Sequence, residues 1–162
     1  MHLEGSCHCG AVRFSVTSRT PQPYMRCYCS ICRKTAGGGG YAINIMGAAE
    51  SLRLEGAENL SVYRARAAAG DPDLVSPARR HFCRHCGSAL YVTDPRWPEL
   101  VHPFASAIDT PLPAPEERAH IMLDHKAPWV EVPDGARDPG FAEYPDQSIE
   151  DWHKARGLYE ED

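Results

Sequence analysis

Hydrophobic and polar residues alternate over short stretches along most of this chain, and helical spacing is rare. In residues 11–17 the apolar side chains of Val12, Phe14 and Val16 fall on one face, which is the pattern of a half-buried β-strand. Comparable runs bounded by turn residues predict a series of short strands connected as hairpins. These further strands are expected at residues 41–46, 51–54, 59–66, 76–82, 88–93, 100–107 and 120–123.

Two segments indicate helices. Residues 29–35 are expected to form a short helix that ends before the glycine run at 37–40. Residues 148–157 carry stronger signals, because Ser148 can cap the first turn, acidic residues follow it, basic residues come late and a glycine ends the segment. Trp152 is expected to pack this helix against the body of the protein.

We interpret the chain as a single, mainly β domain spanning residues 1–162, a length sufficient to bury a substantial core. Its core is expected at about residues 3–145, followed by a C-terminal helical extension at 146–162. Residues 67–72 are expected to form a loop. Trp129 is expected in the core, with a pocket wall as the alternative.

Composition narrows the possible partners. The chain is 43% hydrophobic and 24% charged, with a net charge of −5, which disfavours binding to nucleic acid or to an anionic membrane. No segment approaches the roughly 18–20 apolar residues of a membrane span, and the first residues lack the pattern of a signal peptide. We therefore expect a cytoplasmic protein whose cysteines are reduced.

Seven cysteines fall in three tight clusters, and none lies elsewhere. The four-cysteine set comprises Cys7, Cys9, Cys83 and Cys86, and the cysteine triad comprises Cys27, Cys29 and Cys32. Thiols one or two residues apart in a reducing compartment are typical of metal sites. A tetrahedral zinc–thiolate site has Zn–S distances of about 2.3 Å, so its sulfurs lie about 3.8 Å apart. A turn followed by glycine can bring two sulfurs to this spacing.

The two pairs of the four-cysteine set are each followed by a glycine, so we expect them to close a structural zinc site that contributes to folding. The triad would hold a second zinc with its fourth position free for water or an incoming ligand. Free or redox-active thiols without metal are the alternative for the triad, and an iron–sulfur cluster is a lesser option. His120 and His125 could add ligands, although the thiols suffice without them.

A zinc ion held by three thiolates carries a formal charge of −1 and is a weaker Lewis acid than zinc held by neutral histidines. Activating water for hydrolysis is therefore not its best use. Binding an external thiol as the thiolate, and presenting it to an electrophile, suits such a centre better. The triad thus indicates chemistry on thiols.

Five stretches of the chain resemble the glutathione-dependent formaldehyde-activating enzyme family, also called the GFA or CENP-V/GFA domain. They are GSCHCGAVRF at 5–14, CYCSICRKTAGGGG at 27–40, HFCRHCGSALYV at 81–92, HIMLDHKAPWVEVPDG at 120–135 and FAEYP at 141–145. The resemblance implies an Mss4-like β-fold of small antiparallel sheets held by zinc. It also implies a structural zinc on the four-cysteine set and a second, labile zinc on the triad at the reaction site.

The family resemblance further implies a carbon–sulfur lyase that condenses glutathione with formaldehyde to S-(hydroxymethyl)glutathione. The expected partners are therefore a small-molecule thiol and an aldehyde. Arg33 could pair with a glutathione carboxylate, and Gly38 and Gly39 could let the tripeptide backbone approach closely. A solvated charge and a plain hairpin connection are the alternatives at these positions.

A non-catalytic alternative is a zinc-stabilised module that binds a thiol ligand or a protein partner. The acidic tail GLYEED disfavours a role in chromatin. A redox or methionine-sulfoxide-reductase-like enzyme would need a reactive cysteine outside the metal sites, and the sequence has none.

Overall fold

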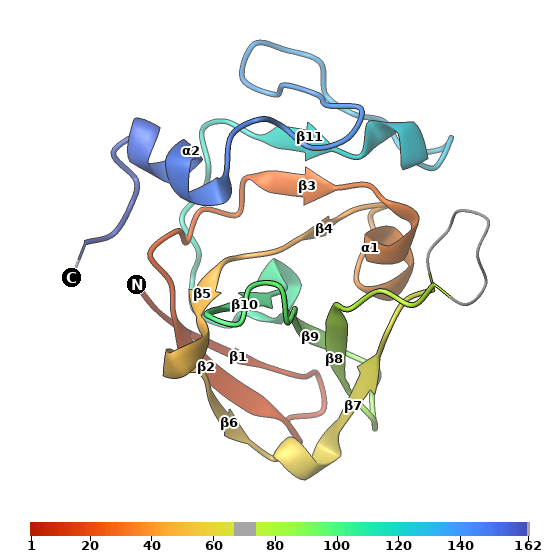
Figure 1. Cartoon of the computed structure of the whole chain (residues 1–162), viewed down its shortest axis with the longest axis vertical. Coiled ribbons are helices and arrows are strands. Elements are labelled where there is room, and N and C mark those ends of the chain that lie inside the picture. The colour runs from red at the N-terminus through yellow and green to blue at the C-terminus, as the bar shows by residue number, and fades with distance from the viewer. Residues whose placement is uncertain (67–73, 162) are drawn as a thin grey trace.

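The computed structural model describes residues 1–66 and 74–161, so the loop expected at 67–72 lies outside the described residues. Within these ranges the chain folds into three small β-sheets and two short α-helices (Figure 1). This confirms the expected fold class, mainly β with small antiparallel sheets and a short C-terminal helix. Single 3-10 turns lie at Ala49–Ser51, Ala57–Asn59, Ala105–Ala107 and Leu123–His125.

The first sheet consists of β1 (His2–Ser6), β2 (Arg13–Thr17) and β6 (Arg53–Glu55), antiparallel and in that order. Strand β2 lies inside the predicted segment 11–17, and its apolar side chains are buried. Strand β1 was not predicted, because its sequence HLEGS has a single large apolar residue. Gly5 of β1 faces Phe14, and a Cβ at Gly5 would lie 2.3 Å from the Phe14 ring. The close approach of these two strands therefore requires glycine.

The second sheet is antiparallel throughout and contributes Cys83, Leu90, Tyr91, Val92 and Val101 to the main core. Its strands, in spatial order, are β5 (Gly47–Ala48), β10 (Leu100–Pro103), β9 (Ala89–Thr93), β8 (Arg79–Cys83) and β7 (Leu60–Tyr63). Strands β7, β9 and β10 lie inside predicted segments. Leu90 and Val101 of this sheet pack with Leu3 and Val12 from the first sheet and its turn, and all four are fully buried.

The third sheet departs from the antiparallel pattern. It consists of β11 (Ala119–Ile121), β3 (Met25–Cys27) and β4 (Ala42–Ile43) in that order. Strand β3 pairs antiparallel with β4 but parallel with β11. In Figure 1, β11 and the segments that follow it cover β3 at one end of the molecule. The sequence did not predict β3, because three residues are too few to show alternation and their pairing partner lies far along the chain.

The C-terminal helix α2 (Ile149–Ala155) confirms the prediction together with its cap. The Ser148 hydroxyl accepts a hydrogen bond from the backbone N–H of Asp151 at 3.1 Å. Trp152 packs the helix on the body of the protein as expected. Its ring stacks on Tyr24, with centroids 3.6 Å apart and planes 9° from parallel.

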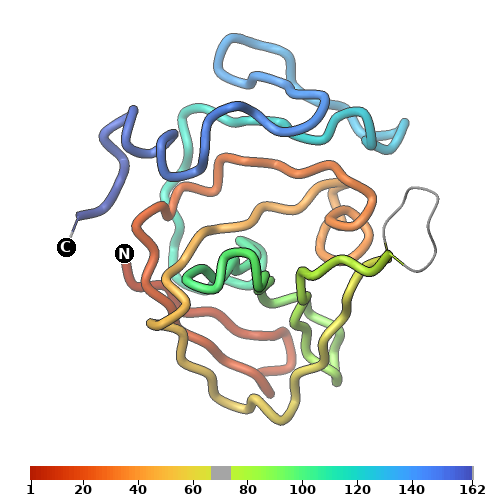
Figure 2. Tube along the Cα trace, in the orientation of Figure 1, coloured from red at the N-terminus to blue at the C-terminus, as the bar shows by residue number. Residues whose placement is uncertain are grey.

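Both ends of the chain lie on the same side of the molecule (Figure 2). The ammonium group of Met1 donates to the carbonyl of Ser18 at 2.8 Å and pairs with the carboxylate of Glu160. The backbone N–H of Glu160 in turn donates to the carbonyl of Arg19 at 2.9 Å. These contacts fix the C-terminal segment against the start of the chain.

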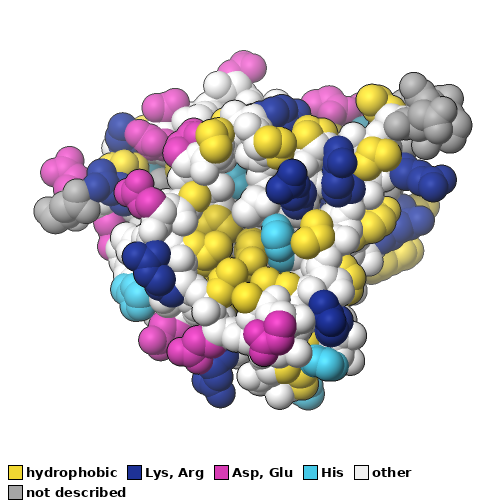
Figure 3. Space-filling model, turned by 60° about the horizontal axis from the view of Figure 1, so that its bottom comes forward, with side chains coloured by type: hydrophobic (Ala, Val, Ile, Leu, Met, Phe, Trp, Pro, Cys, Tyr) yellow, Lys and Arg dark blue, Asp and Glu magenta, His cyan; other side chains and the backbone are white. Residues whose placement is uncertain are grey.

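The molecular surface mixes charges of both signs. Figure 3 shows one face, on which acidic and basic side chains surround a group of hydrophobic ones. Trp129, expected in the core, is instead 68% exposed. Its segment packs inward through Ala127 and Val130, so the indole between them faces outward. Among the described residues, no helix has the length and apolar character needed to cross a membrane.

His153 of α2 is fully buried in its neutral form. Its Nδ1–H donates to the carbonyl of Ile149 at 2.7 Å, and its Nε2 accepts from the backbone N–H of Gln22 at 3.2 Å. Burial lowers the pKa of this imidazole below its ordinary value. A protonated ring would lose its acceptor and place a charge in the interior.

We predict that the stabilisation provided by His153 decreases as the pH falls through about 6.5, the imidazole pKa in an unfolded chain. Below that pH the unfolded chain binds more protons than the folded one. The free energy of unfolding therefore falls toward acid, by up to about 1.4 kcal/mol per pH unit. Denaturant unfolding of the wild type and His153→Gln at several pH values tests this. The stability difference between them should shrink toward acid, since other titrating groups are common to both proteins. A difference independent of pH would contradict the prediction.

Candidate metal centres

Two turns that each end in a glycine gather the four-cysteine set. One comprises residues 7–10 after β1, and the other comprises residues 83–87 between β8 and β9. The glycines that close them, Gly10 and Gly87, have φ angles of 75° and 74°. Each glycine N–H donates to the carbonyl of the first cysteine of its turn at 2.9 Å. Other residues are strained at such φ, so these positions favour glycine, as the sequence indicated.

The four sulfurs all lie within 4.8 Å of one another, which confirms that the two distant pairs meet. Cys9 Sγ lies 3.5 Å from Cys7 Sγ and 3.7 Å from Cys83 Sγ. These distances are close to the spacing of about 3.8 Å in a tetrahedral zinc–thiolate site. Cys7 and Cys83 belong to the buried core, whereas Cys9 and Cys86 are exposed. Four sulfurs can saturate one metal ion and leave no position for a further ligand.

Hydrogen bonds in these turns favour the ionised form, which binds metal, at Cys7 and Cys86. The backbone hydrogen bond from Ala11 also favours ionisation of Cys9, but the neighbouring sulfurs and burial outweigh it and raise the pKa of Cys9 to about 12. The side chain and backbone of Ser88 hydrogen-bond to Cys86 and lower the pKa of its thiol to about 5. Burial opposes ionisation of Cys7, but the N–H of Val12, which donates to Cys7 Sγ at 3.3 Å, and the sulfurs of Cys9 and Cys83 lower its pKa overall. The turns therefore present the sulfurs to a cation.

The cysteine triad lies where β3 ends and helix α1 (Ser30–Thr35) begins. Cys27 is the last residue of β3, and Cys29 is the N-cap of α1, where its Sγ accepts from the N–H of Cys32 at 3.3 Å. The three sulfurs lie within 4.8 Å of one another. The extended chain places the first two on one side, and the cap brings Cys32 to them. This geometry can hold a metal ion with one position left for an external ligand.

Electrostatics at the triad also point to a cation. Hydrogen bonds from the sulfurs of Cys27 and Cys32 lower the pKa of Cys29 to about 2, and the same contacts raise the pKa of Cys27. Three thiols at this spacing cannot all ionise unless a positive charge lies among them. A metal ion supplies that charge, so the donor set fits one.

Two residues that the sequence did not single out lie near the triad. Nη2 of Arg80, on β8, lies 3.9 Å from Cys32 Sγ. The pKa of Tyr144, which is 70% exposed, is raised by partial desolvation of its phenol and then by the charges of the three triad sulfurs. Tyr144 belongs to the FAEYP match, which was a usable signal. Nothing local in the sequence links Arg80 to the triad.

The two histidines considered as extra ligands lie outside both sulfur groups. His125 pairs with Glu143 at 3.2 Å on the surface. His120 is fully buried, and its Nδ1 lies 2.8 Å from the hydroxyl of Tyr28. Burial lowers the pKa of His120, so its ring is neutral near pH 7.

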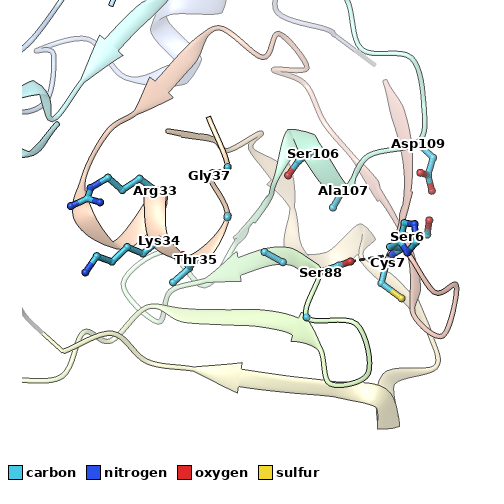
Figure 4. A pocket seen from close by; sticks show the side chains of 15 residues that line it. Ser6, Cys7, Arg33, Lys34, Thr35, Gly37, Ser88, Ser106, Ala107 and Asp109 are labelled. Atoms are coloured by element: carbon cyan, nitrogen blue, oxygen red, sulfur yellow. Dashed lines mark hydrogen bonds between the residues drawn. The ribbon is translucent and has the colours of Figure 1, made fainter. Parts of the chain in front are cut away.

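A cavity of about 760 Å³ lies between the end of α1 and the turns of the four-cysteine set (Figure 4). It is lined by residues 6–8, 33–38, 87–89, 106–107 and 109. Of the residues proposed to contact glutathione, Arg33 and Gly38 line it and Gly39 does not. The triad cysteines are not part of its wall. In Figure 4 the side chain of Arg33 extends away from the opposite wall formed by Ser88 and Asp109.

Comparisons with known proteins agree with this arrangement. Residues 2–124 match the family described as glutathione-dependent formaldehyde-activating enzyme. A protein of Halomonas elongata named "Putative glutathione-dependent formaldehyde-activating enzyme" is 61% identical over 160 residues, which cover 99% of each chain. A crystal structure of a Rhodobacter sphaeroides protein has a TM-score of 0.52 and 31% identity, covering 68% of this chain and 91% of that one. This chain belongs to the glutathione-dependent formaldehyde-activating enzyme family.

Proposed function

We propose that this protein is a zinc-dependent carbon–sulfur lyase/synthase that joins glutathione to formaldehyde, or a related small aldehyde, as S-(hydroxymethyl)glutathione. The observation that carries the proposal is the separation of the seven cysteines into a set of four and a set of three. A set of three sulfurs leaves a ligand position that a set of four does not. The family and the name of the Halomonas relative supply the substrate class.

The two centres would have different roles. Zinc on the four-cysteine set would be structural, because it would join the turn after β1 to the β8–β9 hairpin from far apart in the sequence. The triad is local, spanning six consecutive residues from Cys27 to Cys32, so zinc there would contribute less to folding and could exchange. This difference supports assigning the reaction to the triad.

At the triad, bound zinc would lower the pKa of the glutathione thiol and hold its thiolate. The glutathione sulfur would then form a bond to the aldehyde carbon, the carbonyl π electrons would move to oxygen, and the oxygen would take up a proton in place of the one lost by the thiol. The guanidinium of Arg80 offsets the negative charge of the three thiolates. It would thereby favour entry of an anionic thiol.

Glutathione would be held beside α1. Arg33 would offer a positive charge to one of its carboxylates, and the glycines at 38 and 39 would leave room for the peptide backbone. A Cβ at Gly38 would meet no atom within 4 Å, which supports an open approach there.

The proposed reaction predicts that the protein speeds exchange between free and hydroxymethylated glutathione at equilibrium. Exchange NMR with glutathione and formaldehyde should show a rate at least about tenfold above the uncatalysed one, a barrier lower by about 1.4 kcal/mol. Cys29→Ser should return the rate to that of buffer, because it removes a triad ligand. Equal rates with and without wild-type protein would exclude this activity.

The metal content of two variants should distinguish the two centres. Native mass spectrometry should find two zinc ions in the wild type and one in Cys29→Ser, whose unfolding midpoint should change little. Cys83→Ser should lose the structural zinc and unfold several kcal/mol more easily, because that site joins distant segments. The assignment fails if Cys29→Ser loses both ions, or if Cys83→Ser is as stable as the wild type.

Arg80→Met should raise the KM for glutathione about three- to tenfold at low salt, because a positive charge beside the thiolates is lost. Arg80→Lys should lie closer to the wild type, and high salt should reduce the difference. Arg79→Met is the matched control, since Arg79 precedes Arg80 on β8, is exposed and points to the other face of the strand. An equal effect at both positions would refute a specific role of Arg80.

A further inference from the structure

Tyr28 occupies the middle position of the Cys-x-Cys segment of the triad. Because successive side chains of an extended chain point to opposite sides, Tyr28 points away from the side on which Cys27 and Cys29 project. The phenol is almost fully buried and packs against Ala127 and Val130. The direction of the two sulfurs is therefore coupled to the position of this one buried ring.

A chain of polar groups continues from Tyr28 into the interior. Its hydroxyl lies 2.8 Å from Nδ1 of His120, and Nε2 of His120 lies 3.8 Å from Oδ1 of Asp138. Both of these last atoms are buried, and neither has a hydrogen-bond partner among the described residues. A small side-chain shift would join them. Because buried polar groups are normally hydrogen-bonded, we expect these two atoms to pair with each other.

The chemistry of these groups sets which of them donates each hydrogen bond. Asp138 can only accept a hydrogen bond when it is ionised, so the proton of the neutral His120 ring belongs on Nε2. Nδ1 is then an acceptor, and the Tyr28 hydroxyl donates to it. The opposite tautomer would place two acceptors against each other in a buried site.

Backbone hydrogen bonds hold the segment around His120 and Asp138 in place. The N–H of His120 donates to the carbonyl of Pro139 at 2.9 Å, and the carbonyl of His120 accepts from Phe141 at 2.7 Å. The guanidinium of Arg118 lies 3.7 Å from Asp138 Oδ1. Strand β11, which carries His120, is itself paired with β3. The position of Asp138 is thus tied to the strand that ends in the triad.

We propose that Tyr28, His120 and Asp138 are positioning residues that fix the direction of the Cys27 and Cys29 sulfurs and so set the metal affinity of the triad. This inference rests on the part of the proposed function that places a metal ion at the triad. Hydrogen bonds behind metal ligands commonly change affinity by about 10–100-fold when they are removed.

Tyr28→Phe tests this, because it removes only the hydroxyl and keeps the packed ring. Tyr24→Phe is the matched control, since Tyr24 is equally buried, precedes the same strand, and its hydroxyl has no hydrogen-bond partner among the described residues. Protein with one equivalent of zinc on the four-cysteine set is titrated with Co²⁺, whose thiolate charge-transfer absorption reports the triad. We expect Tyr28→Phe to weaken triad affinity about tenfold and alter this absorption, with Tyr24→Phe unchanged.

Further variants examine His120 and Asp138. Asp138→Asn should also weaken metal binding at the triad. The double variant with Tyr28→Phe should lose less binding free energy than the sum of the two single losses, because both changes interrupt the same series of hydrogen bonds. His120→Gln, whose amide can accept and donate, should bind more tightly than His120→Leu. Unchanged triad affinity in Tyr28→Phe, an equal loss at both metal sites, or strictly additive effects would overturn the inference.

The outcomes separate this inference from the proposed function. If Tyr28→Phe binds metal weakly at the triad and the wild type does not catalyse the exchange, the positioning role stands and the proposed reaction is refuted. Unchanged binding in an active Tyr28→Phe protein would remove the positioning role alone. A wild-type triad that binds no metal would overturn both.

Discussion

The architecture depends on four sulfurs that meet between two turns far apart in the sequence. Cys7 extends from the first sheet and Cys83 belongs to the second, so their contact joins the two layers of the main core. The strands are short, between two and five residues in the described chain, and strands of this length give little independent stability. Ionised sulfurs this close together repel one another unless a cation neutralises them. Charge balance at this point is therefore a condition for the packing around it.

The triad uses the same donor atoms under a different constraint. Its three sulfurs come from six consecutive residues, so gathering them closes a short loop and ties no distant segments together. Its geometry is held from behind, by the parallel pairing of β3 with β11 and by the buried phenol of Tyr28. One centre thus supports the fold, while the other depends on the fold for its shape.

Local signals carried the correct predictions from the sequence. The glycine after each cysteine pair, the cap at Ser148 and the alternation in residues 11–17 all act within a few residues, and the structure contains each of them. The division of the cysteines into four and three followed from ligand counting and glycine placement. These features need no knowledge of which strands pair.

Features set by distant partners were missed. Strands β1 and β3 form because of their neighbours, and the outward position of Trp129 depends on which side of its segment packs. Arg80 reaches the triad from a strand of another sheet, and no spacing in the sequence reveals it. Sequence placed Arg33, Gly38 and Gly39 together after the triad, whereas the cavity wall includes the first two and omits the third.

The order of these elements along the chain has a consequence for biosynthesis. All ligands of the four-cysteine set have been made once residue 86 has left the ribosome, and the strands of the first and second sheets are complete at residue 103. The backing of the triad, from β11 to Asp138, is translated later. A nascent chain can therefore acquire this scaffold before the segments that pack behind the triad have been made.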